Sequence, residues 1–123
     1  MNILAIDYGS KRVGLAVAVN GIIEPLAVVP NNKDLLTKIK EITVEYQVSK
    51  IYVGLSEGDF AKKILAFVKR LSAMILLPVE TVEESVSTIE ADQIYLKNKR
   101  KKKEYKQTID SIAAAVILRR VLD

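Results

Sequence analysis

The side chains in this sequence that could carry out acid–base or metal chemistry are carboxylates. The 123 residues include neither histidine nor cysteine, which excludes a Ser-His triad, a thiolate nucleophile and the usual zinc sites. Three acids, Asp7, Glu84 and Asp110, lie far apart in the sequence but could converge in the fold. Carboxylate oxygens favour hard ions such as Mg²⁺ or Mn²⁺. Two such ions, about 4 Å apart, could activate water and stabilise the leaving oxygen in phosphodiester hydrolysis.

Asp7 stands where an apolar segment ends and a short polar turn begins. The β-rich segments 2–8 and 12–19 predict two paired strands, and the dipeptide Asn20-Gly21 predicts a hairpin into a third strand over 22–29. An aspartate that ends a buried strand is costly unless a metal ion or hydrogen-bond donors compensate its charge. On this spacing alone, an Asp that caps its own turn explains the residue equally well.

The remaining chain alternates between helical and strand patterns. Apolar periodicity predicts helices over residues 35–46, 60–71, 87–96 and 109–121. Short apolar segments predict strands over 50–55 and 74–82. This order predicts a single α/β domain over residues 1–123, with a mixed five-stranded sheet and helices on both faces. The first three strands would form an antiparallel meander, and the fourth and fifth would run parallel to the first.

The expected topology brings the candidate acids toward one edge of the sheet. Asp7, Glu57 and the pair Glu83-Glu84 fall at the carboxyl ends of the parallel strands, where sites in such sheets gather. Side chains alternate along a strand, so only one acid of the pair can be a ligand. Thr108 is a plausible cap for the last helix and would place Asp110 in its first turn, where a carboxylate also favours the helix dipole.

The net charge of +4 is concentrated in one segment. Residues 97–106 hold seven of the 19 basic residues and one of the 15 acidic ones. Such a block is typical of a phosphate-backbone contact, although it could also be a solvated loop or a frayed helix end. The expected substrate contacts in it are Lys99, Arg100, Lys101, Lys102 and Lys103.

Neither a membrane nor a secretory signal is expected. The apolar segments are too short to span a bilayer, and the N-terminus enters a strand pattern without a basic region or cleavage site. The sequence therefore predicts a cytoplasmic protein.

The segment Asp7-Tyr8-Gly9-Ser10-Lys11-Arg12-Val13-Gly14-Leu15-Ala16 resembles the opening signature of the YqgF (RuvX) family. The similarity continues through residues 52–55, 78–91 and 101–118 and so covers essentially the whole chain. Members of this family are RNase H-like proteins related to the RuvC Holliday junction resolvases. The resemblance implies an RNase H-like fold, a divalent-metal nuclease and trimming of the 5′ end of the small-subunit ribosomal RNA precursor, pre-16S rRNA; resolution of Holliday junctions is the older proposal.

Residue by residue, the resemblance implies that Asp7, Glu84 and Asp110 are catalytic acids and metal ligands. Lys11 and Arg12 correspond to the basic turn of the family, where phosphate contacts are expected.

Three departures from the family pattern concern the region of these acids. Glu83 stands where the family usually has Asp, and Ser85 where it usually has Arg. The loop after Leu55 is shortened and lacks the usual proline. Related nucleases often take an acid from this strand end, so Glu57 is a rival or additional ligand beside Glu84.

Three hypotheses follow, of which a nuclease is the first. It would use Mg²⁺ or Mn²⁺ on structured RNA, with branched DNA as a second substrate class and ribosomal particles as partners. A non-catalytic ribosomal RNA-binding module is the second hypothesis. An ATPase half-domain of the actin and sugar-kinase type is the third, and it ranks well below the others because the chain is too short for a second lobe.

Overall fold

The computed structural model describes residues 1–56, 58–83 and 102–122, and the side chains of all of these except 102–110. The strands are β1 (Asn2–Tyr8), β2 (Arg12–Val19), β3 (Ile22–Pro25), β4 (Val29–Pro30), β5 (Val48–Leu55) and β6 (Val79–Glu83). The helices are α1 (Leu35–Glu45), α2 (Phe60–Met74) and α4 (Lys102–Leu122). The helix predicted over 87–96 lies outside the described residues.

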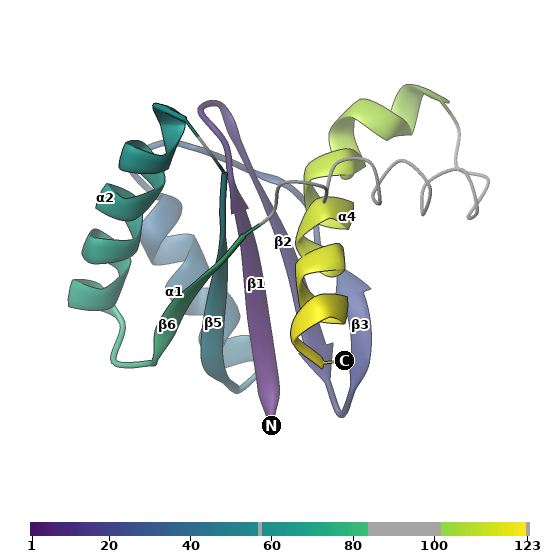
Figure 1. The fold of residues 1–123 in the computed structure, drawn as a ribbon. Helices are drawn as coiled ribbons and strands as arrows, with labels where there is room; N and C mark the ends of the chain where they lie inside the picture. The colour runs from purple at the N-terminus through teal and green to yellow at the C-terminus, as the bar shows by residue number, and fades with distance from the viewer. Residues whose placement is uncertain (57, 84–101, 123) are drawn as a thin grey trace.

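The strands form one mixed sheet in the order β3-β2-β1-β5-β6, with β4 paired to β2 (Figure 1). β1 is antiparallel to β2 and parallel to β5, and β5 is parallel to β6. The predicted antiparallel meander and parallel half are therefore confirmed. The turn between β2 and β3 has positive φ at both Asn20 (53°) and Gly21 (82°), as the Asn-Gly signal predicted.

The sheet has six strands, not the predicted five, because the predicted third strand is divided. β3 ends at Pro25, which pairs with Ala16, and β4 then pairs its Pro30 with Arg12. Proline has no backbone N–H to donate to a strand ladder, so strands containing it break off or lie at an edge. β3 does lie at the edge of the sheet.

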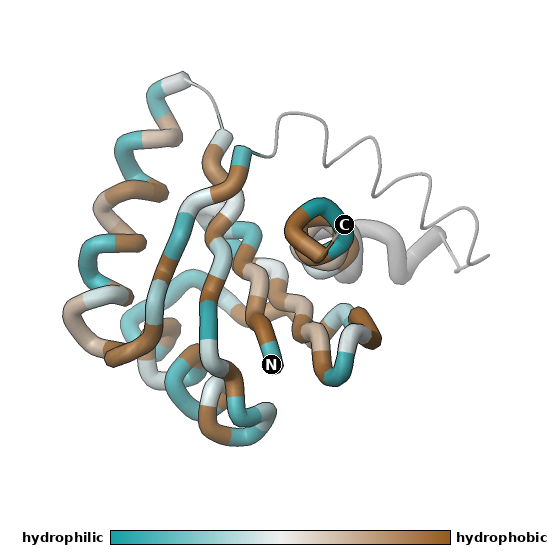
Figure 2. Tube along the Cα trace, turned by 60° about the horizontal axis from the view of Figure 1, so that its bottom comes forward, coloured by the Kyte–Doolittle hydropathy of each residue, from teal (hydrophilic) through white to brown (hydrophobic). Residues whose placement is uncertain are grey.

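Helices cover both faces of the sheet. Side chains of α1 and α2, among them Ile39, Ile64 and Phe67, pack with Leu4 and Ile6 of β1 on one face. Helix α4 packs on the other face, where Ala114 and Leu118 meet a second apolar cluster. Figure 2 shows α4 almost along its axis, separated by the sheet from α2. Alternation along each strand thus assigns every strand residue to the α1/α2 face or to the α4 face.

The face under α4 is made of small side chains. The cross-strand pairs on this face of β1 and β2 are Ile3 with Ala18 and Ala5 with Ala16. Both Ala114 and Ala115 of α4 belong to the same cluster. Small side chains on both partners allow the helix backbone to lie close to the sheet.

Helix α4 begins earlier than predicted. It starts at Lys102, so Thr108 lies inside the helix and does not cap it, and Asp110 is not in the first turn. The lysines of this segment have high helix propensity and no glycine or proline interrupts it, so nothing local stops the helix at Thr108. The favourable dipole interaction of a first-turn carboxylate therefore does not account for Asp110.

The boundary between α2 and β6 also differs from the prediction. Helix α2 continues to Met74, and β6 spans Val79–Glu83 in place of the predicted 74–82. Proline disfavours helix at the preceding residue and lacks a strand donor, so Pro78 separates the two elements and stands immediately before the strand.

Candidate active site

Asp7 lies near the carboxyl end of β1, a strand with neighbours on both sides. Ile3 and Ala5 face α4 and Leu4 and Ile6 face α1 and α2, so alternation places Asp7 on the α4 face. Its side chain is half-buried. The strand end is anchored from the other face, where Tyr8 stacks on Phe67 with ring centroids 4.3 Å apart. Asp7 is therefore held on an ordered strand end and not in a loose turn.

Glycines lie beside Asp7 on both neighbouring strands. Gly14 of β2 is its cross-strand partner. On β5, Gly54 follows Val53, the residue paired with Ile6. Neither neighbouring strand therefore contributes a side chain at the positions next to the carboxylate. Gly54 carries no functional signal in the sequence, because its place beside Asp7 depends on the register of two strands distant in the chain.

Ser111 fixes α4 next to this position. Its side chain is buried, and its Oγ accepts a hydrogen bond of 3.3 Å from the backbone N–H of Leu15. Leu15 follows Gly14 and lies where the pairing of β2 passes from β4 to β3. Asp110 is the residue before Ser111 in α4, although its side chain is not described. The backbone of α4 thus brings the position of Asp110 toward the Asp7–Gly14 pair.

Of the two acids predicted at the end of β6, Glu83 lies within the described residues and Glu84 does not. On β6, Val79 packs with the α1/α2 cluster and Val82 packs with the α4 cluster. Alternation therefore puts Glu83 on the α1/α2 face, opposite to Asp7. The backbone carbonyl of Glu83 accepts a hydrogen bond of 3.0 Å from Arg120 Nη1, which ties the end of β6 to α4.

Several candidate residues cannot be placed. Glu84, Glu57, Lys99, Arg100 and Lys101 lie outside the described residues. Lys102 and Lys103 form the start of α4, without described side chains. Within the described part of the chain, no three acidic side chains gather at one point.

The turn between β1 and β2 carries the exposed residues Ser10, Lys11 and Arg12 at the same edge of the sheet as Asp7. A β-carbon at Gly9 would overlap the carbonyl oxygen of Arg12, so the two ends of the turn approach too closely for any other residue at position 9. Lys11 and Arg12 are thus presented on a closed, tightly bent backbone.

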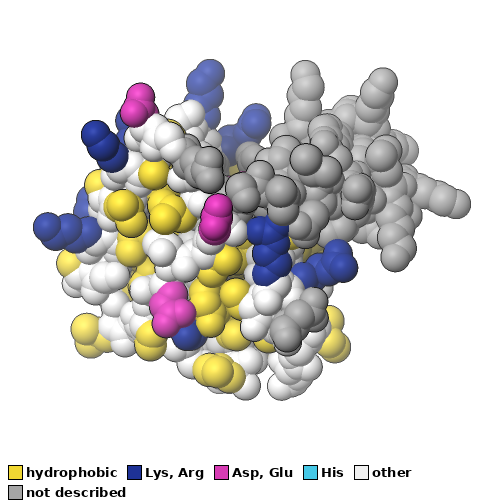
Figure 3. Space-filling view, viewed as in Figure 1, with side chains coloured by type: hydrophobic (Ala, Val, Ile, Leu, Met, Phe, Trp, Pro, Cys, Tyr) yellow, Lys and Arg dark blue, Asp and Glu magenta, His cyan; other side chains and the backbone are white. Residues whose placement is uncertain are grey.

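Basic side chains also occur elsewhere on the surface. On the face shown in Figure 3, Lys and Arg side chains lie over α2 and over the last turn of α4, which contains Arg119 and Arg120. Hydrophobic side chains are visible between them, over β5 and β6. On this face the basic side chains therefore lie in separate places, over α2 and over α4, and do not form one continuous patch.

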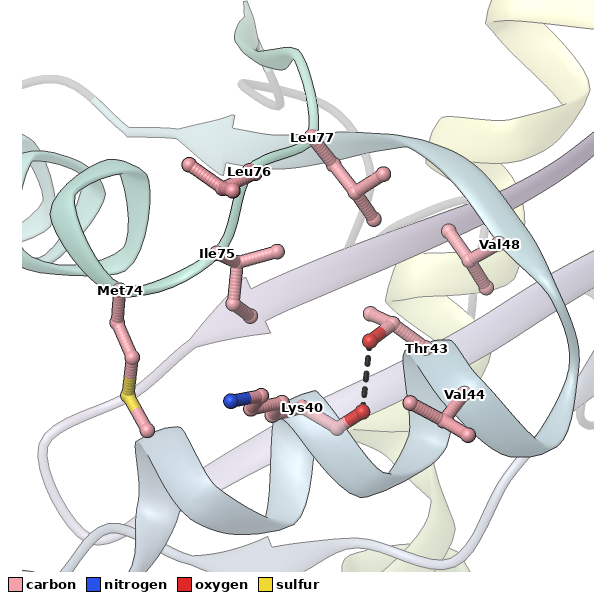
Figure 4. A pocket seen from close by; sticks show the side chains of 8 residues that line it. All are labelled: Lys40, Thr43, Val44, Val48, Met74, Ile75, Leu76 and Leu77. Carbon is pink, nitrogen blue, oxygen red and sulfur yellow. Dashed lines mark hydrogen bonds between the residues drawn. The ribbon is translucent and has the colours of Figure 1, made fainter.

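A pocket of about 330 Å³ lies between α1 and the segment that joins α2 to β6 (Figure 4). Its lining is mainly apolar and includes Val44, Met74 and Leu76, with Lys40 at its side. Ile75 and Val48 of this lining belong to the α1/α2 cluster, so the pocket lies on the face of the sheet opposite to Asp7. It holds no acidic residue and is not the site of the candidate acids.

Comparison with known proteins identifies the family. The family model of RuvX, described as a Holliday junction resolvase, matches residues 1–123. The chain belongs to the RuvX family.

Curated relatives match this RuvX chain over all of its residues and nearly all of their own. A protein of Dictyoglomus turgidum is 32% identical over 138 residues, which cover 100% of this chain and 94% of the relative. A protein of Listeria monocytogenes is 32% identical over 136 residues and is covered to 98%. Both carry the name "Putative pre-16S rRNA nuclease".

Solved structures similar to this RuvX chain confirm the RNase H-like fold. RuvC of T. thermophilus in complex with a Holliday junction substrate matches with a TM-score of 0.62 at 15% identity, over 99% of this chain and 96% of that chain. The Holliday junction resolvase of fowlpox virus matches with a TM-score of 0.58 at 16% identity, over 99% and 97%. No helix in the described ranges is long and apolar enough to cross a membrane.

Proposed function

We propose that this protein is a Mg²⁺- or Mn²⁺-dependent nuclease that hydrolyses phosphodiester bonds in structured RNA. Membership of the RuvX family and the RuvC-like fold support a nuclease. The names of the relatives support pre-16S rRNA as the substrate, with 5′-end processing during ribosome biogenesis as the role. Precursor ribosomal particles in the cytoplasm would then present the substrate.

The observation that carries the proposal is the setting of Asp7. A half-buried carboxylate ends a central strand, has a glycine on each neighbouring strand, and faces a helix that carries a second acid. The donor set also fits the metal, because carboxylate oxygens suit Mg²⁺ and Mn²⁺.

In this proposal Asp7, Glu84 and Asp110 are the metal ligands and catalytic acids. A metal ion held by these residues would supply Lewis-acid chemistry, activating a water and neutralising charge on the leaving oxygen. Glu84 is preferred to Glu83 because Glu83 lies on the α1/α2 face, opposite to Asp7. Lys11 and Arg12 hold the phosphate backbone beside the acids, and Lys99, Arg100, Lys101, Lys102 and Lys103 supply salt-dependent affinity.

The first experiment compares Asp7→Asn with the wild-type protein in hydrolysis of a pre-16S rRNA fragment with Mn²⁺. We expect the rate to fall by more than 100-fold, while calorimetry shows that Mn²⁺ binding is lost. Glu41→Gln is the matched control, because Glu41 is exposed on α1 and therefore lies on the other face of the sheet. Equal activity of Asp7→Asn and wild type would refute the assignment.

Branched DNA is the second candidate substrate, favoured by the likeness to RuvC crystallised with a Holliday junction. The same protein preparation is tested on a four-way DNA junction and on the RNA fragment, each with Mn²⁺. Faster cleavage of the junction would transfer the proposal to DNA. RNA binding without Mn²⁺ uptake or cleavage would favour the non-catalytic RNA-binding module.

A further inference from the structure

Asn31 makes two hydrogen bonds to the turn between β1 and β2. Its side-chain Nδ2 donates to the carbonyl oxygen of Gly9 at 2.7 Å, across 22 residues of sequence. Its backbone N–H donates to the carbonyl oxygen of Lys11 at 2.9 Å. Asn31 therefore holds the beginning and the middle of the turn at once.

The strand before Asn31 brings it to this position. β4 pairs with the start of β2, with Pro30 opposite Arg12 and Val29 opposite Val13. The Asn31 side chain is half-buried, whereas Lys11 and Arg12 are exposed. The backbone of the turn is thus fixed from one side, while its two basic side chains are exposed.

A polar side chain is not needed here to complete the fold. β4 and the Asn31 backbone bond already join the segment to the turn. The Nδ2 bond adds a restraint on Gly9, two residues from Asp7 and two from Lys11. A loop already held in its bound conformation loses less entropy when its ligand binds.

We propose that Asn31 is a positioning residue that holds the turn so that Lys11 and Arg12 together contact the phosphate backbone of the nucleic acid. The proposal rests on the proposed function, because it requires that nucleic acid binds at this edge. Asn31 itself touches the turn and not the reacting atoms.

The test is a double-mutant cycle on the full-length protein. Binding of the pre-16S rRNA fragment is measured in EDTA, which prevents cleavage, for wild type, Asn31→Ala, the double variant Lys11→Ala/Arg12→Ala, and the triple variant. One hydrogen bond contributes about as much free energy as a fivefold change in affinity. We expect Asn31→Ala to weaken binding about fivefold in the wild type and not at all when both basic residues are absent.

Three further measurements separate positioning from general stability. With Mn²⁺, Asn31→Ala is expected to raise KM about fivefold and leave kcat within twofold, as for an interaction equally strong in substrate and transition state. Asn32→Ala is the control, because the Asn32 side chain bonds to the Asp34 N–H and not to the turn. Asn31→Asp, which replaces the donor with an acceptor facing the Gly9 carbonyl, is carried through the same cycle in case Asn31→Ala does not fold.

The outcomes distinguish the two proposals. The inference is overturned if wild type binds the RNA but Asn31→Ala binds equally well, or if Asn31→Ala weakens binding to the same extent with and without Lys11 and Arg12. Wild-type protein that binds neither the RNA nor a four-way DNA junction would overturn the proposed function itself.

Discussion

Ser111 offers the sharpest test of how α4 is held against the sheet. Its side chain is 1% exposed, and its Oγ accepts a hydrogen bond from the buried backbone N–H of Leu15. Replacement by alanine leaves this N–H without its hydroxyl partner, at a cost of about 1–3 kcal/mol. Because unfolding entropy is about 2.1 cal/mol/K per residue, a chain of 123 residues should lose about 4–12 °C in Tm.

The same substitution should also affect chemistry. Ser111 lies next to Asp110 and bonds to the residue after Gly14, the partner of Asp7. A looser α4 would misplace Asp110, so we expect kcat on the RNA fragment to fall about tenfold while KM changes little.

The assays are thermal unfolding by circular dichroism and steady-state cleavage with Mn²⁺. Ser72→Ala is the matched control, since Ser72 is an exposed serine on α2. The reasoning fails if Ser111→Ala melts within 1 °C of wild type, or if Ser72→Ala loses as much stability.

Three other predictions concern the turn, the second acid and the basic block. In a denaturant titration, Gly9→Ala should destabilise the protein by about 1–3 kcal/mol, because the new β-carbon would overlap the backbone. Gly21→Ala should cost about 1 kcal/mol in the same titration, because its β-carbon meets no atom within 4 Å but its φ is +82°. Glu84→Gln should abolish Mn²⁺-dependent cleavage and Glu57→Gln should not; the reverse result would make Glu57 the ligand. Alanine at all three lysines of 101–103 should reduce the slope of log K against log salt for RNA binding by about 2, and an unchanged slope would exclude contact with phosphates.

The order of the strands could be predicted from the sequence because each signal is local. The Asn20-Gly21 turn, the apolar segments around Asp7 and the helical periodicity of 35–46 act within a few residues. The split of the predicted third strand follows from Pro25. The pairing of β4 with the start of β2, which brings Asn31 to Gly9, could not be derived from the sequence. This pairing depends on contacts between residues about twenty positions apart.

The start of α4 was mispredicted because two local signals compete. Thr108 is a good N-cap residue, which favours a helix that begins after it. The charged residues before Thr108 are good helix formers, which favours an earlier start, and the sequence does not show which of these two signals prevails. The face occupied by Glu83 depends in turn on which of Val79 and Val82 meets α4, and that is a tertiary contact. The acids could therefore be named from the sequence, whereas their faces and neighbours required the fold.

The two faces of the sheet differ in the size of the side chains near Asp7. On the α1/α2 face, large side chains such as Leu4, Ile6 and Phe67 form a core that continues to Tyr8, whose ring stacks on Phe67. On the α4 face, β2 presents only small residues: Gly14 opposite Asp7, then Ala16 and Ala18 further along the strand. Such a surface lets α4 approach the sheet closely. The small residues of this face thus allow α4, the helix that carries Asp110, to lie close to the strands that carry Asp7 and Gly14.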